Sequence, residues 1–86
     1  MELKDTVKLM ESEDFKDRFV AEYRQLENRV EGLRAMLKKY KAGTLPFTPK
    51  CSYELLHEQL VHMGSYGRVL DERAEIEGIN LNEEEK

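Results

Sequence analysis

The 86-residue sequence contains no tryptophan, a single cysteine, two prolines, three phenylalanines and four tyrosines. Because a lone Cys51 cannot form an intramolecular disulfide, we expect a protein of a reducing compartment. No apolar run approaches the roughly 18 residues of a membrane-spanning helix. The opening stretch MELKDTVKLM does not have the basic and then apolar order of a signal peptide. These absences favour one small domain that contains neither disulfides nor a membrane span.

The 18 acidic and 14 basic residues give a net charge of −4, which argues against general binding of DNA or other nucleic acids. Their distribution is uneven, because residues 34–50 contain five cations and no acid. We call this range the basic segment, and its cations are Arg34, Lys38, Lys39, Lys41 and Lys50. Lysines are common in the last turn of a helix. A local positive field in an acidic protein also suits a small anionic ligand better than a polymer.

Apolar residues recur every three or four positions in two long stretches, which is the pattern of amphipathic helices. The first stretch consists of Phe19, Tyr23, Leu26, Val30, Leu33, Leu37 and Tyr40, and the second extends from Leu56 to Ala74. The pattern predicts a helix at about 13–41, capped by Ser12 and ended by Gly43. It predicts another at about 52–77, capped by Thr48 or Ser52 and ended by Gly78.

We therefore predict an all-α fold, an antiparallel two-helix hairpin with a short N-terminal helix at about 2–10. In that short helix Leu3, Val7 and Met10 have helical spacing. Residues 1–78 would form a single helical domain, and the glutamate-rich residues 79–86 an acidic, disordered tail. A chain of this size buries only about 60% of its unfolded surface. Self-association is the simplest way to cover the remaining apolar surface, so we expect a homo-oligomer.

Patterns for catalysis and metal binding are incomplete. Cys51 and His57 could act as nucleophile and base, but no third, orienting group accompanies them. Glu54 and His57 have the Glu-x-x-His spacing of di-metal helical bundles, which need two such motifs. Glu58 and His62 are the only other pair at a compatible spacing. We therefore expect no catalytic residue, no metal and no cofactor, and hence a protein that is not an enzyme.

Tyr23 and Lys38 are candidates for stacking on a flat ring and for binding an anion. They are 15 positions apart on the first long helix, about 20 Å along its axis, so they cannot enclose one small ligand within a subunit. In an antiparallel dimer, however, the neighbour's helix end passes Tyr23. The alternative for Tyr23 is that it fills the core.

The stretch Gly64 to Gly67, GSYG, lies within the second predicted helix. Glycine in a helix costs about 1 kcal/mol relative to alanine. Small residues allow another helix backbone or a flat ligand to approach closely, and both interpretations remain open. Arg68 and Arg73 follow the stretch, and arginine pairs suit phosphates.

The run RFVAEYRQLENRVEGLRAML, the proline-containing loop and the run LLHEQLVHMGSYGRVLDERAEI together resemble a family of small helical phage proteins. These are the cyclic-nucleotide sponges that counter CBASS immunity (anti-CBASS protein two), to which sponges acting against Thoeris are related. The resemblance covers about residues 18–76 and includes the ladder Gln59, Met63, Tyr66, Leu70 and Arg73.

The resemblance implies a non-enzymatic homohexamer in the cytoplasm of the host bacterium. It would evade host immunity by binding cyclic di- and trinucleotides in separate pockets between subunits and releasing them unaltered. The loop at 43–52 and the N-terminal arm depart from the family pattern, so the exact ligand stays open and includes cyclic ADP-ribose isomers. The alternative is a structural or adaptor hairpin that mediates oligomerisation, with its lysines merely solvated.

The resemblance also implies roles for five residues. Tyr23 matches the tyrosine that stacks on a base of the cyclic dinucleotide. Lys38 matches the lysine that contacts phosphate from the neighbouring chain, with Lys39 in its place if the register shifts by one. Arg73 and Arg68 fall where the family binds cyclic trinucleotides, at a three-fold junction.

Overall fold

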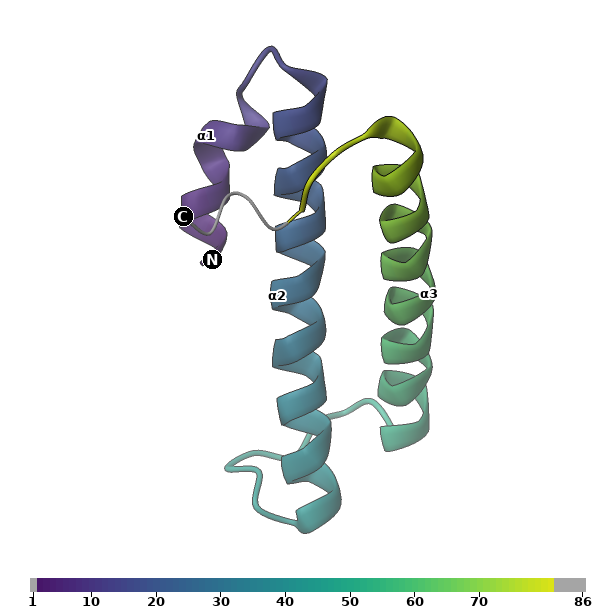
Figure 1. The fold of residues 1–86 in the computed structure, drawn as a ribbon. Coiled ribbons are helices and arrows are strands. Elements are labelled where there is room, and N and C mark those ends of the chain that lie inside the picture. Colours follow the sequence, from purple (N-terminus) through teal and green to yellow (C-terminus); the bar gives the residue numbers. More distant parts are fainter. Residues whose placement is uncertain (1, 82–86) are drawn as a thin grey trace.

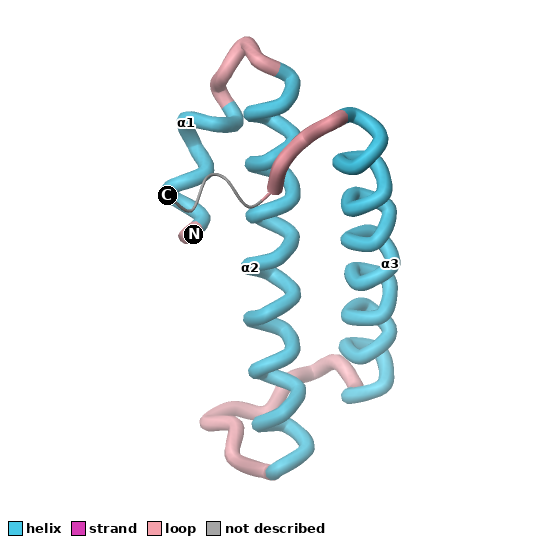
Figure 2. Tube along the Cα trace, viewed as in Figure 1, coloured by secondary structure: helices cyan, strands magenta, loops and turns pink. Residues whose placement is uncertain are grey.

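Two long helices that run side by side in opposite directions form the body of the molecule (Figure 1). The computed structural model describes residues 2–81. Its elements are the 3₁₀ helix η1 (Leu3–Thr6), and the α-helices α1 (Val7–Met10), α2 (Phe15–Ala42) and α3 (Tyr53–Glu77). Within the described range there is no strand, and Figure 2 shows helices connected by loops. The predicted all-α hairpin with a short N-terminal helix is confirmed.

Helix α2 begins two residues later than predicted, because Asp14 and not Ser12 is its N-terminal cap. The Asp14 carboxylate accepts a hydrogen bond from the backbone N–H of Lys16 at 2.8 Å. The hydroxyl of Ser12 instead donates to Asp17 at 2.7 Å, which ties the preceding turn to the helix. The helix ends as predicted at Gly43, whose φ of 74° is in the left-handed region that glycine adopts without strain.

Helix α3 has the ends that local sequence signals predict. Ser52, one of the two predicted caps, accepts a hydrogen bond from the backbone N–H of Leu55 at 3.1 Å. At the other end Gly78 has φ 70°. The N–H of Ile79 then donates to the carbonyl of Ala74 at 2.8 Å, which is the bond of a Schellman turn. This turn sends the chain back toward α2 (Figure 1).

The core lies between α2 and α3 at the end of the hairpin nearer the termini. Its buried members are Phe19, Val20, Leu26, Leu70, Ala74 and Ile79. Leu70 is fully buried, and Leu81 packs against the cluster. The predicted domain boundary at residue 78 is therefore too early for Ile79 and Leu81, since the turn at Gly78 returns them to the core. The rest of the predicted tail, residues 82–86, lies outside the described residues.

The N-terminal arm, η1 with α1, packs against α2 with a different face from the one that spacing suggests. Leu3, Val7 and Met10 are 40–50% exposed, whereas Thr6 is fully buried. The Thr6 hydroxyl accepts a hydrogen bond from the Gln25 amide at 2.9 Å and donates to the carbonyl of Leu3 at 2.6 Å. A 3₁₀ helix turns about 120° per residue, so α-helical spacing does not identify its buried face.

No helix in the described part of the chain combines the length and the hydropathy that crossing a bilayer requires.

Candidate functional site

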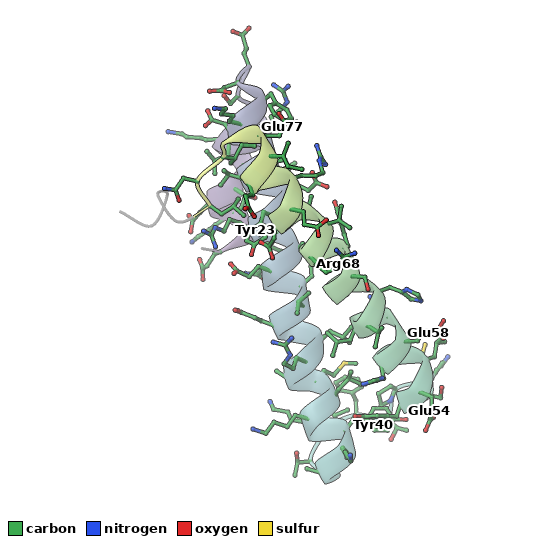
Figure 3. The ribbon with its side chains drawn as sticks, turned by 45° about the vertical axis from the view of Figure 1, so that its right-hand side comes forward. Tyr23, Tyr40, Glu54, Glu58, Arg68 and Glu77 are labelled. Atoms are coloured by element: carbon green, nitrogen blue, oxygen red, sulfur yellow. The ribbon has the colours of Figure 1, made fainter. Side chains whose placement is uncertain are left out.

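A groove of about 260 Å³ lies between α2 and α3. Figure 3 labels Tyr23 on α2 and Arg68 on α3, the two predicted site residues that border it. Its lining combines an aromatic ring, aliphatic side chains, two glycines and three charged groups. The lining residues are Tyr23, Leu26, Glu27, Val30, Met63, Gly64, Gly67, Arg68 and Asp71.

The glycines of α3 leave this groove open. A Cβ atom at Gly67 would lie 3.7 Å from the Leu26 side chain, an ordinary van der Waals contact, and one at Gly64 would meet nothing within 4 Å. Packing of α3 on α2 therefore does not require glycine at either position. Each glycine costs the helix about 1 kcal/mol relative to alanine. Since helix packing does not account for this cost, the open space that the glycines leave in the groove requires a functional explanation.

Tyr23 belongs both to the edge of the core and to the wall of the groove. It is partly buried and packs against the core, and it also lines the groove. Burial is the largest cause of a raised pKa of its hydroxyl, and hydrogen bonding to Asp71 together with the negative charges of Asp71 and Glu27 raises the pKa further. The phenol is therefore neutral at physiological pH and keeps its O–H as a hydrogen-bond donor.

The charged rim of the groove includes two acids that the sequence analysis did not single out, Glu27 and Asp71. Glu27 accepts a hydrogen bond from the buried Arg24 guanidinium at 2.8 Å. Both acids are four residues beyond a groove residue, Glu27 after Tyr23 and Asp71 after Gly67. Since residues four apart share a helix face, this spacing is the signal that could have found them.

Lys38 and Lys39 lie away from the groove. Both are exposed and line a separate surface hollow of about 340 Å³ with Ala35, Ala42 and Thr44. The 15 positions from Tyr23 to Lys38 correspond to about 20 Å along α2. The structure therefore does not bring the predicted stacking ring and the predicted phosphate-binding lysine together within one chain.

The two predicted arginines have different surroundings. Arg68 lines the groove, and its guanidinium forms an ion pair with Glu72 at 3.0 Å. The guanidinium of Arg73 lies over the Phe19 ring, 5.0 Å from its centroid. Five residues along an α-helix correspond to a rotation of about 140°, so Arg73 is on a different side of α3 from Arg68.

The weaker candidates for chemistry lie at the loop end of the hairpin. Cys51 is exposed there, and the His57 ring stacks on Tyr53 with centroids 6.0 Å apart and 16° between the planes. Residues 2–81 contain no group of three or more His, Cys, Asp or Glu side chains that could hold a metal ion.

The model of the Sequestin family matches residues 13–76. This range spans α2 and almost all of α3, and includes every residue to which the resemblance gives a role. Comparison with curated proteins and with solved structures found no match.

Proposed function

Because the chain belongs to the Sequestin family, whose name is that of a sequestering protein, we propose that it is a phage sponge for cyclic oligonucleotide immune signals. It binds cyclic di- and trinucleotides, keeps them from the receptors of CBASS-type defence and does not degrade them. One observation carries the proposal: Tyr23, which matches the stacking tyrosine of the sponges that the sequence resembles, lines an open groove with aliphatic walls and glycines.

The groove suits a nucleotide base. A base that enters it can stack on the Tyr23 ring and contact the side chains of Leu26 and Met63, while Gly64 leaves room for the flat ring. Stacking of a base on an aromatic side chain contributes about 1–3 kcal/mol. The volume of about 260 Å³ is below the roughly 300–1,000 Å³ of sites for drug-sized ligands. The rest of a cyclic dinucleotide therefore lies outside the groove.

A second subunit completes the site. The groove has one cation, Arg68, which is paired with Glu72, and two acids, so it cannot neutralise two phosphates alone. When two copies pack antiparallel, the basic segment of one copy lies along the part of α2 that contains Tyr23 in the other copy. Lys38 of the neighbouring subunit then reaches the phosphates beside Tyr23. A two-fold axis presents both groups twice, which matches the near two-fold symmetry of a cyclic dinucleotide.

Cyclic trinucleotides bind elsewhere in this proposal, at a three-fold junction that includes Arg73. The position of Arg73 on a different side of α3 from the groove supports separate pockets. The resemblance puts the assembly at six subunits, and cyclic ADP-ribose isomers are further candidate ligands.

A second candidate function is a structural or adaptor hairpin that mediates protein–protein contacts. Exposed apolar side chains along α3 favour it, since Leu55, Val69 and Ile76 are 56%, 41% and 83% exposed. In that case the basic segment is solvated and binds no ligand.

Isothermal titration of the full chain against a panel of cyclic di- and trinucleotides separates the two functions. We expect saturable binding of at least one cyclic dinucleotide, and recovery of the intact ligand after heat denaturation. Tyr23→Ala and Lys38→Ala should each abolish dinucleotide binding while sedimentation still shows the oligomer. Lys8→Ala, which removes an exposed lysine of the N-terminal arm, is the control and should bind normally. If no ligand of the panel binds, the result favours the adaptor function.

A further inference from the structure

The N-terminal arm has an apolar face that is about half exposed. On this face Leu3, Val7 and Met10 are 40%, 47% and 50% exposed. A different face holds the arm to α2, because the buried Thr6 hydroxyl accepts a hydrogen bond from the Gln25 amide at 2.9 Å. Figure 1 shows the arm and α3 on opposite sides of α2. The exposed face of the arm is therefore available to another molecule.

The arm covers only the first part of the α2 face on which it packs. At intervals of seven, three, four and three positions, Gln25 is followed on this face by Gly32, Ala35, Lys39 and Ala42. All four are exposed, and a Cβ atom at Gly32 would meet nothing within 4 Å. The last three line the surface hollow of about 340 Å³. The hollow is therefore continuous with the surface that the arm already covers.

The arm and the hollow complement each other in charge and in size. Residues 2–14 contain five acids and two lysines, whereas the basic segment, which includes the hollow, contains five cations and no acid. Opposite charges on two surfaces favour their association and fix its register. The hollow has the small side chains of Ala35 and Ala42, and the exposed face of the arm has larger ones. A second copy of this chain is therefore a partner that fits the hollow.

The antiparallel pair proposed above brings the two surfaces to the same height. In that pair, Lys38 of one copy is level with Tyr23 of the other. Because the two helices run in opposite directions, Gln25, two positions after Tyr23, is level with Met36, two positions before Lys38. Thr6 fixes the arm to Gln25, so the arm lies beside the hollow of the neighbouring copy.

The arm and the ligand occupy different sides of this pair. Around α2, Gln25 is about 160° from Tyr23. Lys38 is about 60° from Tyr23, whereas Lys39 is about 40° from Gln25. A two-fold axis perpendicular to both helices puts equivalent faces of the two copies on the same side. Lys38 is therefore on the side of the ligand, and Lys39 is on the side of the arm.

We propose that the exposed face of the arm docks into the hollow of a second copy, so that two equivalent contacts hold the pair together. The inference rests on the proposed function, whose site needs two subunits. In each contact Val7 packs on Ala35, and Lys39 lies beside the acids of the arm. This docking holds Lys38 of the neighbouring subunit beside Tyr23 before a ligand binds.

Cysteine cross-linking of the full chain tests the contact directly. Val7→Cys and Ala35→Cys are combined with Cys51→Ser, which removes the native thiol, and treated with a short bismaleimide. Within one chain the two new thiols are about 15 Å apart along α2, because the arm contacts this helix at Gln25. A linker shorter than this joins only two chains, so we expect a covalent dimer. Val7→Cys with Ser65→Cys, an exposed position of α3, is the control and should stay monomeric on a denaturing gel.

Val7→Lys tests whether the contact contributes to assembly. The substitution removes an apolar side chain from each of the two contacts and adds a cation near Lys39 of the other copy. Self-association, measured by analytical ultracentrifugation over a concentration series, should weaken by at least roughly tenfold. Val61→Lys on α3 is the matched control, since Val61 is 52% exposed against 47% for Val7. It should associate as the wild type does, and circular dichroism verifies that both variants keep their helices.

The outcomes distinguish this inference from the function on which it rests. Absence of the Val7–Ala35 cross-link, or equal weakening by Val7→Lys and Val61→Lys, would overturn docking of the arm, and the sponge function would stand if the wild type binds cyclic dinucleotides. Cross-linking without binding of any cyclic dinucleotide would support the arm contact and overturn the dinucleotide site. A wild-type chain that sediments as a monomer at micromolar concentration would overturn both.

Discussion

The guanidinium of Arg73 on α3 lies over the ring of Phe19 on α2, with its central carbon 5.0 Å from the ring centroid. Phe19 is only 3% exposed and belongs to the core. Arg73 therefore covers the outer side of a core aromatic residue while its charge stays at the surface. Any ligand bound by Arg73 would meet a cation that is already positioned by this ring.

Arg73→Ala should lower the free energy of unfolding by about 0.5–1 kcal/mol, the strength of an exposed cation–π contact. It should also weaken cyclic trinucleotide binding and leave dinucleotide binding intact, because Arg73 does not line the groove. Urea denaturation and titration calorimetry measure the two effects. Arg29→Ala, at an exposed position of α2, is the control and should change stability by less than about 0.5 kcal/mol. A loss of dinucleotide binding in Arg73→Ala would contradict separate pockets.

Alkaline pH should destabilise the wild type more than Tyr23→Phe. Burial and the neighbouring Asp71 raise the pKa of Tyr23 above its ordinary value of 10.0. The unfolded chain therefore releases this proton at a lower pH than the folded chain. The resulting stabilisation is complete below about pH 10 and is lost as the pH rises through the higher pKa of the folded state.

The difference in unfolding free energy between wild type and Tyr23→Phe, measured by urea denaturation over a pH series, checks this. Phenylalanine does not titrate, so the comparison cancels the ionisation of lysines and other tyrosines. A difference that stays constant into the alkaline range would contradict the raised pKa.

Thr6→Val should loosen the N-terminal arm. The substitution keeps the shape of the buried side chain but removes the hydroxyl that accepts from Gln25 and donates to Leu3. We expect a loss of about 1–3 kcal/mol, because the Gln25 amide loses its oxygen acceptor. Limited proteolysis should then cut within the arm faster, whereas cleavage within α2 should not change. Equal rates in wild type and variant would mean that the hydroxyl does not hold the arm.

Ser52→Ala should lower stability by about 1 kcal/mol, because it removes the side chain that caps α3. Ser65→Ala is a matched control, since Ser65 lies exposed within the same helix, where alanine has the higher helix propensity. That variant should be equally or slightly more stable than wild type. Thermal unfolding followed by circular dichroism compares the two. The same change in both variants would rule out capping as the cause.

Most of the fold was predictable because its signals are local. The spacing of Phe19, Leu26 and Leu37 marks the buried face of α2, and glycines after each long helix supply the left-handed conformation that ends it. The cap of α2 was missed because Ser12 and Asp14 are both good capping residues two positions apart. The backbone path of the arm decides which of them is used.

Less of the site was predictable, because a groove requires two helices in register. Tyr23 and Arg68, which the structure places on the same groove, were predictable from the sequence. Asp71 was not, because it lines the same groove as Tyr23 only after α2 and α3 have packed. Lys38 stays a prediction, since within one chain it lines a hollow separate from the groove.

The two long helices, the glycines that end them and the concentration of positive charge in the basic segment follow from the order of residues alone, because they depend on neighbours within a few positions. Packing decides the rest: the buried face of the arm, the return of Ile79 to the core, and the open space beside Gly64 and Gly67. Each of these depends on contacts between residues far apart in the chain, whose distances are set only when the helices have docked.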